Sequence, residues 1–185
     1  KNYDYYKDSV SKIRELIAEE RLVCIDSEDG ANLSTLERSL KYLRKKYPYK
    51  KVLVVLDNCF NLTDFHNLES TARMTRIADI LKSLSVKYQC TLFSSAEYRK
   101  YDISNTQKIR LPTNDDLADA RALKYRASVI IHVYNDLNDR GDEANVFHIA
   151  NKNIGKAQPR LLLVFGKNKI SSFKQKLVMD LHTDS

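Results

Sequence analysis

The sequence is poor in cysteine and has no long apolar run, and both absences narrow its class. Cys24, Cys59 and Cys90 lie in or beside apolar stretches and form no C-x-x-C pair. We therefore expect buried, reduced thiols rather than disulfides or a zinc site. No run approaches 18 apolar residues, and there is no signal-peptide core. These absences predict a cytoplasmic protein without a membrane partner.

Several common functional motifs are also missing. The chain has no internal repeat and no G-x-x-x-x-G-K-[ST] motif, because the run beginning at Gly155 lacks the first glycine and the hydroxyl. A nucleoside triphosphate therefore has no evident phosphate anchor here. Ser94 and Ser95 have no G-x-S-x-G elbow around them, which argues against a hydrolase nucleophile. His66 and His148 have no partners at metal-ligand spacing, so we expect ordinary surface or core histidines.

Length and composition are those of an ordinary globular chain. The 185 residues are 43% hydrophobic and 30% charged, and we expect residues 1–185 to form a single, partial domain. The 31 basic against 24 acidic side chains give a net charge of +7. This surplus favours an anionic partner such as nucleic acid, although a distributed surplus of this size also occurs in proteins that bind none.

Apolar periodicity predicts an α/β fold. Helical spacing or capping residues indicate helices over residues 1–20, 32–47, 71–88 and 114–126, and short apolar runs indicate strands over 21–26, 52–56, 90–95, 128–134, 145–150 and 160–165. Alternation of strand and helix in the first half favours a mostly parallel sheet flanked by helices. The last two strands, joined by a short connection with a basic tip, favour a C-terminal antiparallel hairpin.

The most informative stretch is Lys51 to Asn58, KVLVVLDN. It follows a turn-like, lysine-rich run and predicts a central strand buried on both faces, from whose carboxyl end Asp57 emerges. Ligands bind at that edge of parallel sheets, and a carboxylate there, with Asn58 beside it, suits a hydrated magnesium ion on a nucleotide phosphate. An ordinary turn or N-cap aspartate is the alternative.

A polar loop over 97–113 is the second candidate. Its basic residues are Arg99, Lys100, Lys108 and Arg110. A long segment without expected secondary structure usually has a functional role or is mobile, although such charges also serve simply to keep a loop solvated.

Taken together, several of these pieces resemble a known family. In order they are LVVLDN, TARMTRIADILKSLSVKY, SSAEYRK, LPTNDDLADARALKYRASVIIHVYND and HIANKNIGKA. This set resembles the later part of the motor domain of DnaB-type replicative helicases, which are hexameric ATPases of the RecA-like P-loop class. The resemblance covers roughly residues 21–165, and its most specific part runs from Leu111 to Asp136.

The resemblance implies ATP and Mg²⁺ as cofactors and assigns roles to individual residues. Asp57 falls on the Walker B aspartate, which orients magnesium, with Asn58 beside it. Glu97 falls after the strand that carries a polar sensor of the phosphate site. The implied DNA-binding residues are Arg99, Lys100, Lys108, Arg110, Arg121, Lys124 and Arg126. Lys152 falls on a finger that reaches the neighbouring subunit's nucleotide, although Asn153 and Ile154 stand where an arginine is expected.

The same resemblance implies single-stranded DNA, a hexameric ring of identical subunits and a primase or loader as partners, in a bacterial or phage-infected cell. Because the Walker A motif is missing, the chain is either a fragment of a longer motor protein or a degenerate relative that serves as a non-catalytic DNA-binding or assembly scaffold. We favour the fragment and expect no ATP hydrolysis by the chain alone. An unrelated α/β nucleotide-binding regulator is a weaker alternative.

Overall fold

The computed structural model describes residues 2–26, 28, 30–98, 111–117, 121–134 and 160–180. The elements in chain order are α1 (Asn2–Ala18), α2 (Leu33–Lys46), β1 (Leu53–Leu56), the 3₁₀ turn η1 (Cys59–Asn61), α3 (Ser70–Lys87), β2 (Thr91–Ser94), α4 (Arg121–Arg126), β3 (Val129–Tyr134), β4 (Arg160–Asn168) and β5 (Lys176–Asp180). Within the described part of the chain, no helix is both long and apolar enough to cross a membrane.

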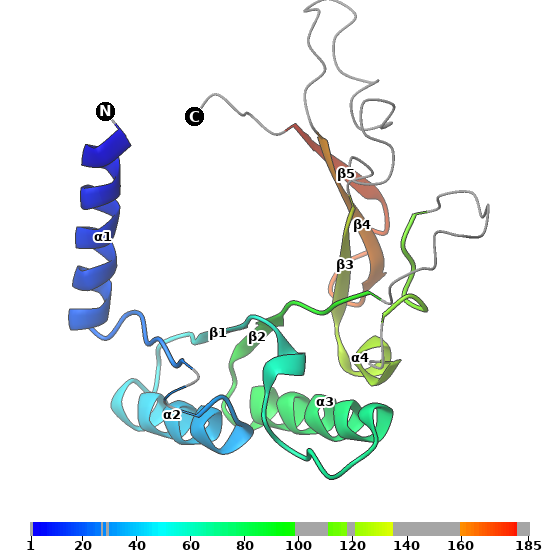
Figure 1. The fold of residues 1–185 in the computed structure, drawn as a ribbon, viewed down its shortest axis with the longest axis horizontal. Helices are drawn as coiled ribbons and strands as arrows, with labels where there is room; N and C mark the ends of the chain where they lie inside the picture. Colours follow the sequence, from blue (N-terminus) through cyan, green and yellow to red (C-terminus); the bar gives the residue numbers. More distant parts are fainter. Residues whose placement is uncertain are drawn as a thin grey trace, which may run out of the picture.

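One layer of the fold consists of β1 and β2 lying on α2 and α3 (Figure 1). The two strands pair in parallel, with Leu53 opposite Thr91 and Leu56 opposite Ser94. Helix α3 presents a row of buried side chains at helical spacing, and α2 adds its own leucines. The core consists of Leu33, Leu36, Leu40, Cys59, Leu62, Met74, Ile77, Leu81, Leu84, Tyr88 and Cys90. The predicted α/β class and the parallel pairing of these strands are confirmed.

The start of α2 shows why the predicted boundary is correct. Asn32 is the N-cap, and its side-chain Oδ1 accepts a hydrogen bond from the Thr35 backbone N–H at 2.8 Å. This bond satisfies one of the amides that a helix leaves unpaired at its first turn. Just before it, Gly30 has φ of 89°, a conformation that favours glycine.

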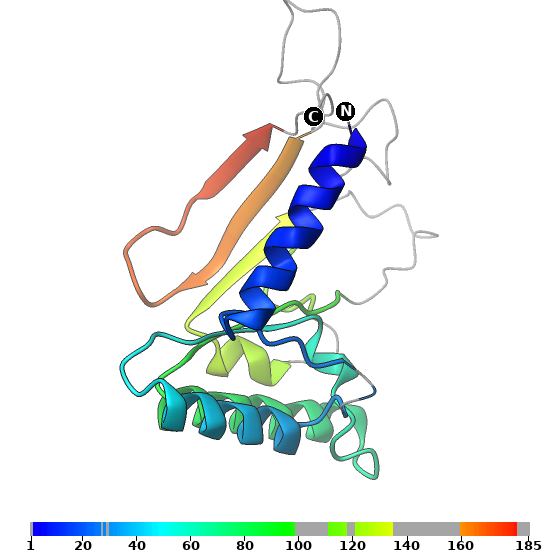
Figure 2. The same cartoon turned by 90° about the vertical axis from the view of Figure 1, so that its left-hand side faces the viewer.

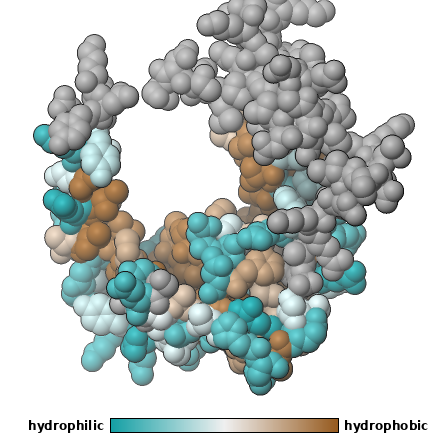
Figure 3. Space-filling view, in the orientation of Figure 1, coloured by the Kyte–Doolittle hydropathy of each residue, from teal (hydrophilic) through white to brown (hydrophobic). Residues whose placement is uncertain are grey.

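The prediction that β1 is buried on both faces is wrong. Its residues alternate between exposed and half-buried, and Leu53 and Val55 are 64% and 63% exposed. The inward residues Val54 and Leu56 pack on the helical core, whereas no described helix covers the other face. Figure 3 shows apolar surface around the resulting hollow between α1 and the second sheet. An apolar run alone does not reveal how many faces are covered.

The predicted strand over 21–26 is also wrong. Residues 22–26 have no regular secondary structure, and Leu22, Val23 and Ile25 are exposed. A strand requires a neighbouring ladder, and the described strands provide none at this segment. The preceding helix α1 forms as predicted but projects away from the α2–α3 layer (Figure 1).

The second sheet is antiparallel, in the order β3-β4-β5. It stands beside the first layer and extends away from it, as Figure 2 shows. The described strands therefore form a parallel pair and a separate antiparallel sheet, rather than the mostly parallel sheet that we predicted. An antiparallel C-terminal hairpin is present, but it joins β4 to β5. The predicted strand over 145–150 lies outside the described residues.

Only the end of the predicted helix over 114–126 is helical in the described residues, as α4. The carboxylate of Asp116 accepts hydrogen bonds from the backbone N–H and the hydroxyl of Thr113, at 2.6 and 2.9 Å. This arrangement closes a turn over 113–116. Polar side chains that can cap a helix can equally stabilise a turn, and here Asp116 does so.

All three cysteines are free. Cys59 and Cys90 are buried, as predicted, and burial raises the pKa of both thiols. Cys24 is exposed because the segment that contains it is not a strand. The prediction of burial is therefore correct for two thiols and wrong for the third.

The one-sided packing of β1 predicts a strong asymmetry between two core-size substitutions. Ile77→Ala, on the buried face of α3, should lower the free energy of unfolding by about 2–5 kcal/mol. Val55→Ala, on the open face of β1, should change it by less than about 1 kcal/mol. Urea unfolding of the 185-residue chain, followed by circular dichroism, measures both. Equal losses would show that the outer face of β1 is buried.

Candidate functional site

The carboxyl ends of β1 and β2 bring two polar side chains together. Asp57 follows β1 and Ser95 follows β2. Because the strands are parallel and in register, these residues lie side by side, and the Ser95 hydroxyl donates a hydrogen bond to Asp57 Oδ1 at 2.8 Å. Both residues are exposed. The carboxylate thus faces solvent at the sheet edge where α/β proteins bind ligands.

A second pair lies beside the first. The Asn58 side-chain amide donates a hydrogen bond to Glu97 Oε1 at 3.2 Å. The Asn58 side-chain oxygen accepts from the Phe60 backbone N–H at 2.8 Å and thereby caps η1. Asn58 is therefore engaged on both sides. It connects the segment after β1 to the segment after β2.

Arg73 of α3 determines the path of the chain after this edge. Its guanidinium donates to the backbone oxygens of Asp64 at 2.9 Å, Phe60 at 3.4 Å and Leu62. The Asp64 carboxylate in turn accepts from the Leu33 backbone N–H at 2.9 Å. A planar guanidinium can satisfy several carbonyls at once. Arg73 therefore fixes the 60–64 segment between the edge and α2.

The predicted site residues fall into two groups. The structure brings Asp57, Asn58 and Glu97 together at one edge, whereas Arg121 and Lys124 lie on α4. The remaining predicted residues lie outside the described part of the chain: Arg99, Lys100, Lys108, Arg110 and Lys152.

The basic residues of α4 differ in their availability. Lys124 forms an ion pair with Asp115 at 2.7 Å, which raises the pKa of Lys124 and lowers that of Asp115. Arg126 pairs with Asp79 of α3. Arg121 is exposed and forms no ion pair with another described residue. Of the three, Arg121 is the residue whose charge is directly available to an anion.

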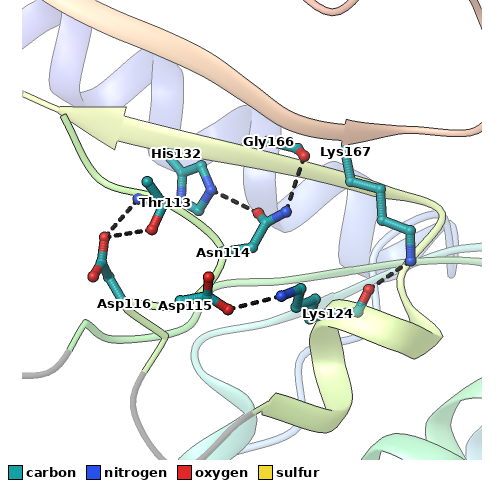
Figure 4. Close-up of polar contacts among 8 residues, drawn as sticks. All are labelled: Thr113, Asn114, Asp115, Asp116, Lys124, His132, Gly166 and Lys167. Atoms are coloured by element: carbon teal, nitrogen blue, oxygen red, sulfur yellow. Dashed lines mark hydrogen bonds and ion pairs between the residues drawn. The ribbon is translucent and has the colours of Figure 1, made fainter.

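A buried histidine links the two halves of the structure. His132 of β3 is 1% exposed, and its Nδ1 lies 2.9 Å from the hydroxyl of Tyr98, one residue after Glu97. On its other side, Nε2 lies 2.8 Å from Asn114 Oδ1 (Figure 4). An amide oxygen only accepts, so Nε2 carries the proton and Nδ1 accepts from Tyr98. His132 is therefore a neutral bridge from the segment after β2 to the 111–117 segment.

Strand β4 completes this junction. The Asn114 amide donates to the Gly166 backbone oxygen at 2.9 Å (Figure 4). A Cβ at Gly166 would overlap both Asn114 and His132. Lys167 donates to the backbone oxygens of Lys124 and Tyr125 at 2.5 and 3.2 Å, at the end of α4. Hydrogen bonds thus hold the 111–117 segment and α4 against the second sheet.

Sequence reasoning missed two parts of this arrangement. Ser95 was considered only as a nucleophile, although its place directly after the strand that follows β1 could have indicated a partner for Asp57. His132 was expected to pack against a helix layer, whereas it hydrogen-bonds to Tyr98 and Asn114. Nothing in the local sequence signals those distant partners.

The donor set at the edge suits a hard cation such as magnesium. Asp57, Ser95 and Glu97 supply oxygen atoms, which are the ligands that Mg²⁺ prefers. Among the described residues, no group of three or more histidine, cysteine, aspartate or glutamate side chains could enclose a metal ion. The edge therefore fits an ion that keeps several waters and contacts one carboxylate.

The neutral state of His132 predicts a pH dependence of stability. Burial lowers its pKa, and the nearby Asp116 carboxylate partly opposes this shift. The unfolded chain therefore takes up the proton first, and stability should fall as the pH drops below about 6.5, by at most about 1.4 kcal/mol per pH unit. Urea unfolding between about pH 7.5 and 5.5 tests this. His132→Gln should flatten the dependence, and exposed His66→Gln should not; the same slope in all three proteins would contradict it.

Comparison with known proteins places this geometry in context. No family model and no curated protein matches the chain. Among solved structures, it is similar to the ATPase domain of one DnaB-like replicative helicase (TM-score 0.65, 17% identity, covering 81% of this chain and 48% of that one). It is also similar to "The Structure Of A DnaB-Like Replicative Helicase And Its Interactions With Primase" (TM-score 0.66, 16% identity, 84% and 34%).

The chain thus spans about half of the first of these proteins and a third of the second. At such low identity the likeness concerns the fold. It agrees with the resemblance found in the sequence, and the chain has the fold found in the ATPase part of DnaB-like replicative helicases.

Proposed function

We propose that this chain is part of the motor domain of an ATP-dependent replicative DNA helicase, in which ATP hydrolysis drives movement along single-stranded DNA. The observation that carries the proposal is the exposed Asp57 carboxylate beside Ser95, at the carboxyl edge of two parallel strands. The fold shared with a solved helicase ATPase domain supports it.

In this proposal Asp57 holds a water of a hydrated magnesium ion bound to the ATP phosphates. The ion neutralises charge on those phosphates. Ser95 keeps the carboxylate oriented through its hydrogen bond at 2.8 Å. Asn58 and Glu97 form the polar link between the two strand ends, where a change at the phosphate side reaches the chain beyond Glu97.

The DNA-facing role is assigned to the chain beyond β2. Arg121 offers an available charge on α4, and Lys124 can contact a phosphate only by exchanging its Asp115 partner. Arg99, Lys100, Lys108 and Arg110 belong to the same proposed surface. Lys152 is proposed to supply charge to the nucleotide of a neighbouring subunit in a hexameric ring, and a primase or loader is the proposed protein partner.

The second candidate function is a non-catalytic DNA-binding or assembly scaffold with the same fold. The absence of a G-x-x-x-x-G-K-[ST] motif from the sequence favours it. ATP turnover by the natural full-length protein separates the two candidates, because a scaffold hydrolyses no ATP.

Replacing the magnesium-side carboxylate tests the motor directly. In the full-length protein, Asp57→Asn should lower steady-state ATP turnover by orders of magnitude, because the amide keeps the shape but loses the charge that orients the ion. Asp8→Asn, on the outer surface of α1, is the matched control and should leave turnover unchanged. Unaltered turnover in the Asp57 variant would refute the assignment.

The DNA-facing assignment predicts salt-dependent binding. Fluorescence anisotropy of a labelled single strand should show weak binding by the 185-residue chain, with affinity falling as salt rises. Arg121→Gln should reduce the slope of log affinity on log salt by about 0.7, the contribution of one phosphate contact on a single strand. Arg14→Gln removes the same charge from the exposed surface of α1 and should leave the slope unchanged. Absent or salt-independent binding contradicts the assignment.

A further inference from the structure

The excess positive charge of the chain is concentrated in one short stretch. Residues 41–51, with the sequence KYLRKKYPYKK, contain six lysines and arginines, three tyrosines and no carboxylate. They account for six of the seven surplus charges, so the rest of the chain is nearly neutral. The stretch spans the end of α2, the connecting turn and the approach to β1, and this turn projects at the edge of the molecule (Figure 2).

Two basic residues of the stretch are used by the fold. The Arg44 guanidinium donates to the backbone oxygens of Tyr88, Lys50 and Gln89, at 2.5, 2.5 and 2.6 Å. Lys46 pairs with Glu20 at 2.6 Å and lies over the rings of Tyr42 and Tyr47. These contacts anchor the end of α2 to its surroundings, and they occupy both charges.

Three other lysines of the stretch remain available to a ligand. Lys45, Lys50 and Lys51 are exposed, and none of them forms an ion pair within the described part of the chain. Tyr49, which lies among them, is 97% exposed. A tyrosine ring normally buries much of its apolar area, so a ring held almost wholly in water next to these lysines calls for a ligand.

The turn holds Tyr49 in place. The Lys50 backbone N–H donates to the Tyr47 backbone oxygen at 3.2 Å, which makes Pro48 and Tyr49 the central residues of a four-residue turn. Proline restricts the backbone at the first central position. The Arg44 guanidinium holds the Lys50 backbone oxygen. Binding through Tyr49 therefore costs little backbone ordering.

These features fit one class of ligand. Exposed lysines attract a phosphate backbone, and an exposed aromatic ring stacks on a base only when that base is unpaired. A duplex offers the phosphates but hides the base faces. We propose that the 45–51 turn binds single-stranded nucleic acid, with Lys45, Lys50 and Lys51 on phosphates and Tyr49 against a base.

The location separates this site from the proposed motor site. The turn precedes the amino end of β1, whereas Asp57 follows its carboxyl end, and α4 packs on α3. The proposal does not depend on nucleotide binding at Asp57 or on the charge of Arg121. A strand bound at the turn lies at the opposite end of β1 from Asp57.

A charge variant tests the phosphate contacts. Anisotropy of a fluorescein-labelled oligothymidine with the 185-residue chain is measured over a salt series for Lys45→Gln/Lys50→Gln/Lys51→Gln. Loss of three phosphate contacts should reduce the slope of log affinity on log salt by about 2. The control Lys82→Gln/Lys169→Gln/Lys174→Gln lowers the net charge equally at exposed positions elsewhere and should retain the slope. Equal effects of the two variants would overturn the proposal.

Variants of the ring test stacking. Tyr49→Leu should weaken oligothymidine binding about fivefold or more, and Tyr49→Phe should retain it, because stacking needs the ring and not the hydroxyl. Tyr6→Leu, at an exposed tyrosine of α1, is the matched control. Circular dichroism confirms that each variant folds. Unchanged binding by Tyr49→Leu would overturn the proposal and leave a surface that recognises charge alone.

Two further probes decide between ligand classes. Vesicles of phosphatidylserine and phosphatidylcholine test an anionic membrane surface, and a dT·dA duplex of the same length tests preference for unpaired bases. Tighter binding to either than to the oligothymidine, with loss in the turn variants, would overturn the proposal. If Arg121→Gln abolishes oligothymidine binding and the turn variants do not alter it, the turn proposal fails while the motor proposal stands.

Discussion

The packing of α3 against α2 and the inner face of β1–β2 is the constraint on which the site depends. Ile77 of α3 and Leu40 of α2 are almost completely inaccessible to solvent, and each buried aliphatic side chain of this kind contributes about 1.5–3 kcal/mol. Because both strands lie on the same helices, they are held parallel and in register. That register alone brings Asp57 and Ser95 within hydrogen-bonding distance.

The rest of the described structure is attached in a different way. The 111–117 segment and the second sheet meet through His132, Asn114 and the backbone of Gly166, with Tyr98 as the link to β2. Buried polar contacts of this kind are directional, and each loses much of its value when one partner is removed. The junction therefore fixes the orientation of the segments, whereas the apolar core fixes only their proximity. A change at the strand edge can reach α4 through these bonds.

The contrast between local and non-local information explains which predictions were correct. Helices α1, α2 and α3 and the cap at Asn32 were predictable, because apolar spacing and capping depend on residues within one turn. The face of β1 that is covered, the missing strand at 21–26 and the extra strand β5 depend on which distant segments lie alongside. Asp57 was predictable from its position after an apolar run. Its pairing with Ser95 and the bridge at His132 arise only from tertiary contacts.

The charge distribution gives a physical reason to treat the two ends of β1 as different environments. Read as a total, +7 implies only a weak attraction of the whole chain to anions. Charges interact across about 8 Å at physiological ionic strength, so a total spread over the surface has little local effect. Here the surplus lies in residues 41–51, before β1, while the carboxylates of Asp57 and Glu97 lie beyond its other end and that of β2. A polyanion and a hydrated cation are thus attracted to opposite ends of the same strand.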